Sequence, residues 1–240
     1  MCKVLAVGDI HTKMWIIESV TKLINQYDCI VFIGDYADDW DQSPLKTIET
    51  WRRLKMLTSL YPDKVRALVG NHDFAYLLSF DPRSGGYNRT TQLLLDSPEN
   101  RDLKTWLSKL PVTAEIDGVT YSHAGIDATW NESVNEHSLW ADNSPIWTRP
   151  DDSDYIEVPQ VFGHTPHATC TQLENNIWCI DTFSSYRDGT PIGDQTVLEI
   201  TDGETFNIKK LENNDNNSNT PSVSNEVSEP RSRFNKSTDT

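Results

Sequence analysis

Long apolar runs are missing from this sequence. It has 240 residues, and its hydrophobic fraction is 37%. No run approaches the ~18 consecutive apolar residues that a membrane-spanning helix needs. Nor does a basic segment followed by an apolar one stand at Met1. We therefore expect no membrane contact. A chain of this length can form one large domain with a substantial core, or at most two small ones.

Cysteine and positive charge are also scarce. The four cysteines are not spaced as a disulfide framework, and Cys29 and Cys179 lie within apolar runs. We interpret them as small buried residues of a protein in the reducing cytoplasm. The formal net charge of -15 disfavours a nucleic-acid surface, because phosphate backbones bind clustered lysine and arginine. An acidic protein that acts on an anionic substrate needs another source of positive charge, such as bound divalent cations.

The sequence does contain five short apolar runs that end in glycine or serine followed by aspartate, asparagine or histidine. These endings are Gly8-Asp9-Ile10-His11, Gly34-Asp35, Gly70-Asn71-His72-Asp73, Ser122-His123 and Gly163-His164. Glycine, asparagine and aspartate are ordinary turn residues, but turn chemistry gives no reason for the histidines. At the carboxyl ends of strands, such side chains project into the crevice where open α/β sheets bind ligands. We therefore expect the endings to converge on one site.

The order of the elements predicts an α/β fold. Apolar residues at helical spacing between residues 15 and 27 separate strands at 4–7 and 29–33, which gives a βαβ unit with a parallel pair. Ser43-Pro44 and Ser97-Pro98 are predicted to begin helices that run toward Leu60 and Leu110. The remaining expectations are a strand at 65–69, a short helix at 74–80, a turn at 81–86, a hairpin at 113–122, a long loop at 126–159, and strands at 161–162, 177–180, 196–200 and 205–209.

The end of the chain differs in composition. From residue 212 onward it consists almost entirely of asparagine, serine, aspartate, glutamate, proline and threonine. Such a segment has too few large apolar residues to fold. We therefore expect a domain over residues 1–211 and a disordered tail over residues 212–240.

The polar endings carry a consistent set of possible metal ligands: Asp9, His11, Asp35, Asn71, His123 and His164. Carboxylate, amide oxygen and imidazole without thiolate suit manganese, iron or zinc and disfavour a structural zinc site. The set is larger than one open catalytic metal needs. It fits two ions ~3.5–4 Å apart, an arrangement that clamps both the attacking and the leaving oxygen in phosphoryl transfer.

These motifs resemble a known family. Gly8-Asp9-Ile10-His11, Gly34-Asp35-Tyr36-Ala37-Asp38, Gly70-Asn71-His72-Asp73, Ser122-His123-Ala124-Gly125 and Gly163-His164-Thr165-Pro166 are similar to the motifs of the calcineurin-like metallophosphoesterases, in the same order. The resemblance spans about residues 4 to 181. It implies a four-layer α/β/β/α sandwich of mixed sheets, with the site at the carboxyl ends of the strands.

The resemblance also implies roles for individual residues. It assigns metal ligation to Asp9 and His11 at one ion, to Asn71, His123 and His164 at the other, and to Asp35 as the bridge between them. His72, oriented by Asp38, would donate a proton to the leaving oxygen, which is a task suited to histidine near neutral pH. The implied reaction is in-line attack by metal-bound hydroxide without a phosphoenzyme. The implied cofactors are two divalent ions, with manganese favoured over iron or zinc.

Within that family, several features are similar to the compact bacterial and viral serine/threonine protein phosphatases. Trp147-Thr148-Arg149 resembles a tryptophan-x-arginine element that grips phosphate, so Arg149 is the predicted substrate-binding residue. The chain departs from that pattern at Asp39 and Val69, where the pattern has arginine, and at Asp73, where it has glutamate. We therefore expect a monomeric phosphomonoesterase that acts on phosphoserine or phosphothreonine proteins or on small phosphoesters.

Other interpretations remain open. The same site could hydrolyse a nucleotide, either a dinucleoside polyphosphate or a cyclic phosphodiester, and a remote alternative is a binding module that has lost catalysis. Asp38 could be a loop carboxylate, and Arg149 could pair with Asp151 or Asp152. His137 is interpreted as solvated. His167 follows His164 by three residues with Pro166 between them, a spacing that disfavours metal ligation.

Overall fold

The apolar runs that precede the first three motifs form the parallel strands of one sheet. The computed structural model describes residues 2–40, 42–78, 86–130, 139–149, 155–174 and 176–213. In it, β1 (Lys3–Val7), β2 (Cys29–Phe32) and β3 (Val65–Ala67) are parallel neighbours. β9 (Thr196–Thr201) and β10 (Thr205–Lys210) pair antiparallel and complete sheet A in the order β10-β9-β1-β2-β3. The predicted βαβ opening and final hairpin are confirmed.

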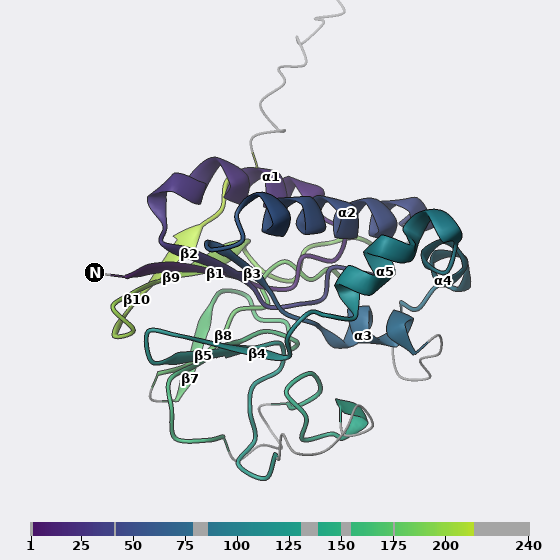
Figure 1. Ribbon diagram of the computed structural model, residues 1–240. Coiled ribbons are helices and arrows are strands. Elements are labelled where there is room, and N and C mark those ends of the chain that lie inside the picture. Colours follow the sequence, from purple (N-terminus) through teal and green to yellow (C-terminus); the bar gives the residue numbers. More distant parts are fainter. Residues whose placement is uncertain are drawn as a thin grey trace, which may run out of the picture.

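Helices cover one face of sheet A (Figure 1). α1 (Met14–Leu23) continues into a 3₁₀ turn, η1 (Ile24–Gln26). α2 (Pro44–Leu60) begins at the predicted N-cap, where the hydroxyl of Ser43 accepts a hydrogen bond from the backbone N–H of Leu45 at 3.3 Å. α4 (Arg89–Leu95) and α5 (Arg101–Leu107) pack beside α2. Among the described residues, no helix has the length and apolar character needed to cross a membrane.

A second mixed sheet, sheet B, is stacked on the other face of sheet A (Figure 1). Its strands are β4 (Thr113–Ile116), β5 (Val119–Ser122), β6 (Gln160–Phe162), β7 (Thr171–Glu174) and β8 (Ile177–Cys179), in the order β4-β5-β6-β8-β7. The three inner strands are parallel and the two edge strands antiparallel. The hairpin between β4 and β5 turns at Asp117 and Gly118, whose positive φ values of 54° and 76° suit a two-residue hairpin loop.

Two apolar cores hold these layers together, and β1 contributes to both. Leu5 and Val7 point toward the helices, where they join a cluster that includes Ile16 and Trp51. Val4 and Ala6 point the other way, into the cluster between the two sheets. A strand buried on both faces has no polar side to expose, which explains why β1 reads as a continuous apolar run.

Some boundaries differ from the sequence-based expectation. α3 begins at Asn71 rather than at residue 74, so Asn71 and His72 belong to its first turn and not to a loop. The helix expected from Ser97 to Leu110 is a 3₁₀ turn, η2 (Pro98–Asn100), followed by the short α5. α4 and β7 were not anticipated. Residues 79–85 and 131–138, which fall in the expected short helix, turn and long loop, lie outside the described residues.

The predicted α/β architecture of two stacked mixed sheets with helices is confirmed. The helical layer that is described covers the outer face of sheet A.

The folded chain continues to Leu211, immediately after β10. The Leu211 side chain is only 3% exposed and joins the core beneath α1, and its backbone N–H donates to the Gln195 carbonyl at 3.0 Å. The Ser19 hydroxyl of α1 donates to the Glu212 carbonyl at 3.0 Å. Residues 214–240 lie outside the described residues, so the disordered tail stays a prediction.

Leu211 offers a test of where the core ends. We expect Leu211→Ala to lower the free energy of unfolding by roughly 2–5 kcal/mol, because it removes a buried leucine and leaves a cavity. Leu93→Ala is the matched control, because Leu93 is 57% exposed on α4. Urea denaturation followed by circular dichroism measures both. Equal, small losses for the two variants would place Leu211 outside the core.

Candidate metal centre

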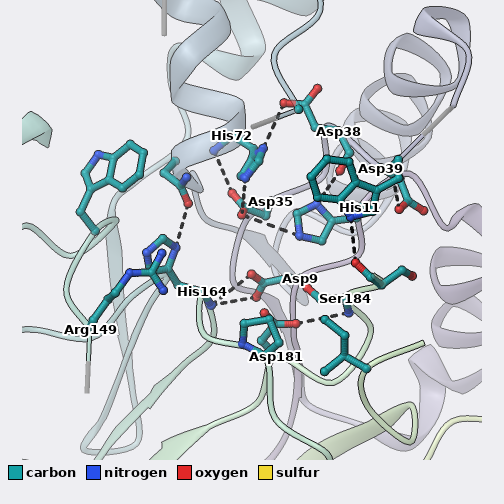
Figure 2. Close-up of a pocket in the computed structure, with 17 residues that line it drawn as sticks. Asp9, His11, Asp35, Asp38, Asp39, His72, Arg149, His164, Asp181 and Ser184 are labelled. Carbon is teal, nitrogen blue, oxygen red and sulfur yellow. Dashed lines mark hydrogen bonds and ion pairs between the residues drawn. The ribbon is translucent and has the colours of Figure 1, made fainter. Parts of the chain in front are cut away.

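The nine predicted site residues gather at one end of the two sheets, and Figure 2 labels seven of them. Eight of them line a pocket of about 340 Å³: Asp9, His11, Asp35, Asp38, Asn71, His72, Arg149 and His164. The ninth, His123, is fully buried and contacts Asn71. The side chains follow β1, β2 and β3 of sheet A and β5 and β6 of sheet B. The site is therefore built by both sheets.

Glycine lets the loops approach one another closely at two of the motifs. A Cβ atom on Gly70 would lie 2.1 Å from Asp35 Oδ1, and one on Gly163 would lie 2.0 Å from Asp9 Oδ1. Both distances are far below van der Waals contact. Any larger residue at either position would displace a carboxylate of the site.

Several site residues adopt a left-handed backbone that side chains ordinarily avoid. The φ values are 38° for His11, 52° for Asp35, 56° for Asp38 and 65° for His164. Each such conformation costs on the order of 1–3 kcal/mol and persists only where the surroundings enforce it. Here the backbone N–H of His11 donates to the Asp35 carbonyl at 2.9 Å, which holds the first two loops together.

The first group of possible ligands is Asp9, His11 and Asp35, with one donor atom from each within 4.8 Å of the others. Nδ1 of His11 lies 2.7 Å from the Asp38 carbonyl oxygen and 3.0 Å from that of Ala37. A carbonyl oxygen can only accept, so Nδ1 carries the proton. The lone pair is then on Nε2, which faces Asp35 Oδ2 at 4.0 Å. A backbone carbonyl that fixes the tautomer in this way is typical of metal-binding histidines.

The second group is Asp35, His123 and His164. By the same reasoning, Nδ1 of His123 donates to the Ile33 carbonyl at 3.2 Å. Nε2 of His123 then presents a lone pair to Asn71 Oδ1 at 2.8 Å and to Asp35 Oδ2 at 3.4 Å. Nδ1 of His164 lies 3.0 Å from the same amide oxygen. Lone pairs that face each other at these distances are stabilised by a cation between them, so the residues fit a metal ion.

The electrostatics of the site also favour bound cations. Burial and the charges of Asp181 and Asp35 raise the pKa of Asp9, because carboxylates buried together repel. Burial lowers the pKa of His11, and burial together with His123 lowers that of His164. Both rings are thus kept neutral, as metal ligation requires. Positive charge among these groups would relieve the repulsion between the carboxylates.

His72 and Asp38 form a hydrogen-bonded pair above the possible ligands (Figure 2). Nδ1 of His72 lies 3.0 Å from Asp38 Oδ2, and the other carboxylate oxygen accepts a hydrogen bond from the Tyr76 hydroxyl at 2.5 Å. Burial acts to lower the pKa of His72, but the carboxylates of Asp35 and Asp38 outweigh it and raise the pKa to about 9. The geometry therefore pairs Asp38 with His72, rather than leaving it as an isolated loop carboxylate.

Asp73 is a further buried carboxylate, and its role is to join segments. It accepts hydrogen bonds from the backbone N–H groups of Tyr36, Ala37 and Gly70 at 3.2 Å and from the Trp51 indole at 2.8 Å. Burial and the charge of Asp35 raise its pKa, whereas the N–H donors lower it. The loop after β2, the loop after β3 and α2 are thereby tied to one side chain.

Arg149 lines the pocket on the side away from Asp38 and Asp39 (Figure 2). Among the described residues that line the pocket, it has the one lysine or arginine side chain. Its two proposed surface partners, Asp151 and Asp152, lie outside the described residues, as does His137. Asp39, at the position where the protein-phosphatase pattern has arginine, pairs with Lys13 at 2.9 Å.

Sequence reasoning did not assign roles to several residues that lie at the site. Asp181 is buried close to Asp9 and accepts a hydrogen bond from the backbone N–H of Ser184 at 3.4 Å. Its strand-ending Ile180-Asp181 resembles the other motifs and could have indicated it. Nothing in the spacing indicated Tyr76. His167 belongs to neither group of possible ligands among the described residues.

Comparison with known proteins identifies the family that shares these features. The family model described as calcineurin-like phosphoesterase matches residues 2–216. The symmetrical bis(5'-nucleosyl)-tetraphosphatase of Vibrio cholerae is 26% identical over 190 residues, which cover 75% of this chain and 66% of that protein. The enzyme of the same name from Vibrio parahaemolyticus is 31% identical over 130 residues, covering 52% and 45%. The chain thus matches less than two thirds of the length of these relatives.

Among solved structures, the cold-active protein-tyrosine phosphatase of a psychrophilic Shewanella species superposes with a TM-score of 0.60. The superposition covers 88% of this chain and 81% of that one, at 19% sequence identity. At this identity the likeness establishes a shared fold and does not bear on substrate.

The hydrogen bonds by which Asp73 joins three segments, the junction at Asp73, give a prediction about stability. We expect Asp73→Ala to lower the free energy of unfolding by on the order of 3 kcal/mol, because it leaves several buried N–H donors without an acceptor. Asp102→Ala is the matched control. Asp102 also lies in the first turn of a helix, but its side chain is exposed and pairs with Lys55 at the surface. Chemical denaturation of both variants makes the comparison, and a loss at Asp73 no larger than at Asp102 would contradict the junction.

Proposed function

Because the chain belongs to the calcineurin-like phosphoesterase family, we propose that it is a metal-dependent hydrolase of nucleotide polyphosphates, with dinucleoside polyphosphates as the substrate class. The observation that carries the proposal is the match to symmetrical tetraphosphatases over 75% of the chain, together with two groups of possible metal ligands that share Asp35. These findings support the nucleotide alternative better than the phosphoprotein substrate expected first.

The proposed ligands divide between the two groups. Asp9 and His11 would hold one divalent ion, and Asn71, His123 and His164 the other, with Asp35 in contact with both. When bound, two such ions supply Lewis acidity and orient the phosphoryl group for in-line displacement. Manganese as the native ion, a cytoplasmic location and a monomeric state stay predictions.

His72 is the proposed proton donor to the leaving oxygen. Its Nδ1 faces Asp38, so its Nε2 is directed into the pocket, 3.9 Å from Asp35 Oδ2. The hydrogen bond that Nδ1 donates to the Asp38 carboxylate favours the protonated imidazole, which is the form that a general acid requires. Tyr76 donates to the far oxygen of Asp38 and leaves the near one for His72.

Arg149 is the proposed contact for phosphate oxygens that are not at the ions. A guanidinium group can bind two oxygens of one phosphate through parallel N–H bonds. Its place on the wall of the pocket, near His164, allows it to reach a phosphate adjoining the one at the reaction centre. A polyphosphate substrate would have such a neighbouring phosphate, whereas a phosphoprotein would not.

A substrate panel tests the proposal. With manganese present, we expect kcat/KM for diadenosine tetraphosphate to exceed that for a phosphoserine peptide or an aryl phosphate by at least about tenfold, equivalent to about 1.4 kcal/mol of transition-state binding. Product analysis by chromatography identifies the bond that is cleaved. Excess chelator should abolish every activity in the panel. A preference for the phosphopeptide would instead restore the protein-phosphatase interpretation.

The role of His72 is tested separately. We expect His72→Asn to reduce kcat by ~10²–10⁴-fold for phenyl phosphate and by less for p-nitrophenyl phosphate, whose leaving group needs less protonation. Metal content, measured by mass spectrometry, should stay as in the wild type. His167→Asn is the control, because His167 is in neither ligand group. Equal losses on both esters would show that His72 does not protonate the leaving group.

A further inference from the structure

Trp40 lies at the mouth of the pocket in an arrangement that fixes its ring. It follows Asp38 and Asp39 in the loop after β2 and lines the same pocket as the possible metal ligands. Its indole N–H donates to the Ser185 carbonyl at 2.8 Å, and its backbone N–H donates to Asp39 Oδ1 at 2.9 Å. Asp39 is itself held by Lys13 at 2.9 Å. The Trp40 ring is therefore held in place by the hydrogen bond of its indole N–H to Ser185.

The rest of the Trp40 ring is available to a ligand. The residue is 40% exposed, although tryptophan is usually well buried. Trp15, Trp51 and Trp178 each pack against another aromatic ring, whereas Trp40 has no aromatic neighbour among the described residues. An indole whose N–H is satisfied and whose face is open is well suited to stack on a planar group.

Charge indicates what kind of group would reach this ring. The carboxylates beside Trp40 in the chain are already paired, Asp38 with His72 and Asp39 with Lys13. Arg149 lies across the pocket from Asp38 and Asp39 (Figure 2). Pro166 and Ile192 add apolar surface to the lining. A bound molecule would therefore direct its anionic part toward the ligands and Arg149, and an uncharged planar part toward Trp40.

We propose that Trp40 is a stacking platform for a nucleobase of the substrate. This inference rests on the proposed function and assigns the nucleoside end of the substrate to the wall formed by Trp40. Stacking of a base on an aromatic side chain tolerates different bases, because every base has a π-face. The platform would thus select for a nucleotide without selecting strongly among nucleotides.

The test compares Trp40→Phe with Trp40→Leu. Both variants lose the hydrogen bond to Ser185, but only phenylalanine keeps an aromatic face. We expect the KM of diadenosine tetraphosphate, relative to that of inorganic tetraphosphate, to rise about 5- to 150-fold in Trp40→Leu, the range for loss of one stacked base. The rise should be several-fold smaller in Trp40→Phe. Equal rises for the two variants, or no change in the ratio of KM values, would overturn the platform.

A second measurement keeps the platform testable if the proposed function fails. Adenosine 5'-monophosphate and inorganic phosphate are compared as competitive inhibitors of aryl phosphate hydrolysis. We expect the nucleotide to inhibit more strongly in the wild type and in Trp40→Phe, and the advantage to disappear in Trp40→Leu. Tight, Trp40-dependent inhibition without turnover of dinucleotides would reject the proposed function and retain the platform. Turnover of dinucleotides with no dependence on Trp40 would do the reverse.

Discussion

The arrangement of the site depends on the contact between the loops that follow β2 and β3. Gly70 approaches Asp35 so closely that a methyl group would not fit between them, and the backbone N–H of His72 donates to Asp35 Oδ1 at 3.0 Å. The Asp73 carboxylate then accepts hydrogen bonds from both loops and from α2, which ties the three segments together. Because these groups are buried, each hydrogen bond would be costly to leave unmade. The loops are consequently held where Asp35 faces His123 of the other sheet.

That arrangement concentrates negative charge in the interior of an already acidic protein. Asp9, Asp35 and Asp181 are all buried at the site. The histidines around Asp35 lower its pKa, whereas burial and the neighbouring carboxylates raise the pKa of Asp9 and of Asp181. Two bound divalent ions would neutralise these carboxylates and supply the positive charge that attracts an anionic substrate. A net charge of -15 and a phosphoester substrate are therefore compatible.

Much of this could be predicted from the sequence, because its strongest features are local. Each strand is an apolar run that ends in a motif, and parallel strands place their ends at the same edge, so the gathering of Asp9, Asn71 and His164 followed from short-range pattern alone. The contacts that sequence reasoning missed are long-range. Tyr76 reaches Asp38 from the far end of α3, and Trp40 reaches Ser185 across 145 residues of chain. Substrate class depends on such contacts and not on the shared motifs, so the sequence left the phosphoprotein and nucleotide interpretations both open.

The order of strands in sheet A has a consequence for how the chain folds. β1 ends at Val7, whereas β9, one of its two neighbours, begins at Thr196, so one edge of β1 is unpaired while the long segment between them is synthesised. Unpaired edges of apolar strands invite pairing with other chains. Contacts of such long sequence separation also form slowly, because the intervening chain must be ordered first. The edge of β1 that pairs with β9 therefore stays open until residues 196–201 have been made.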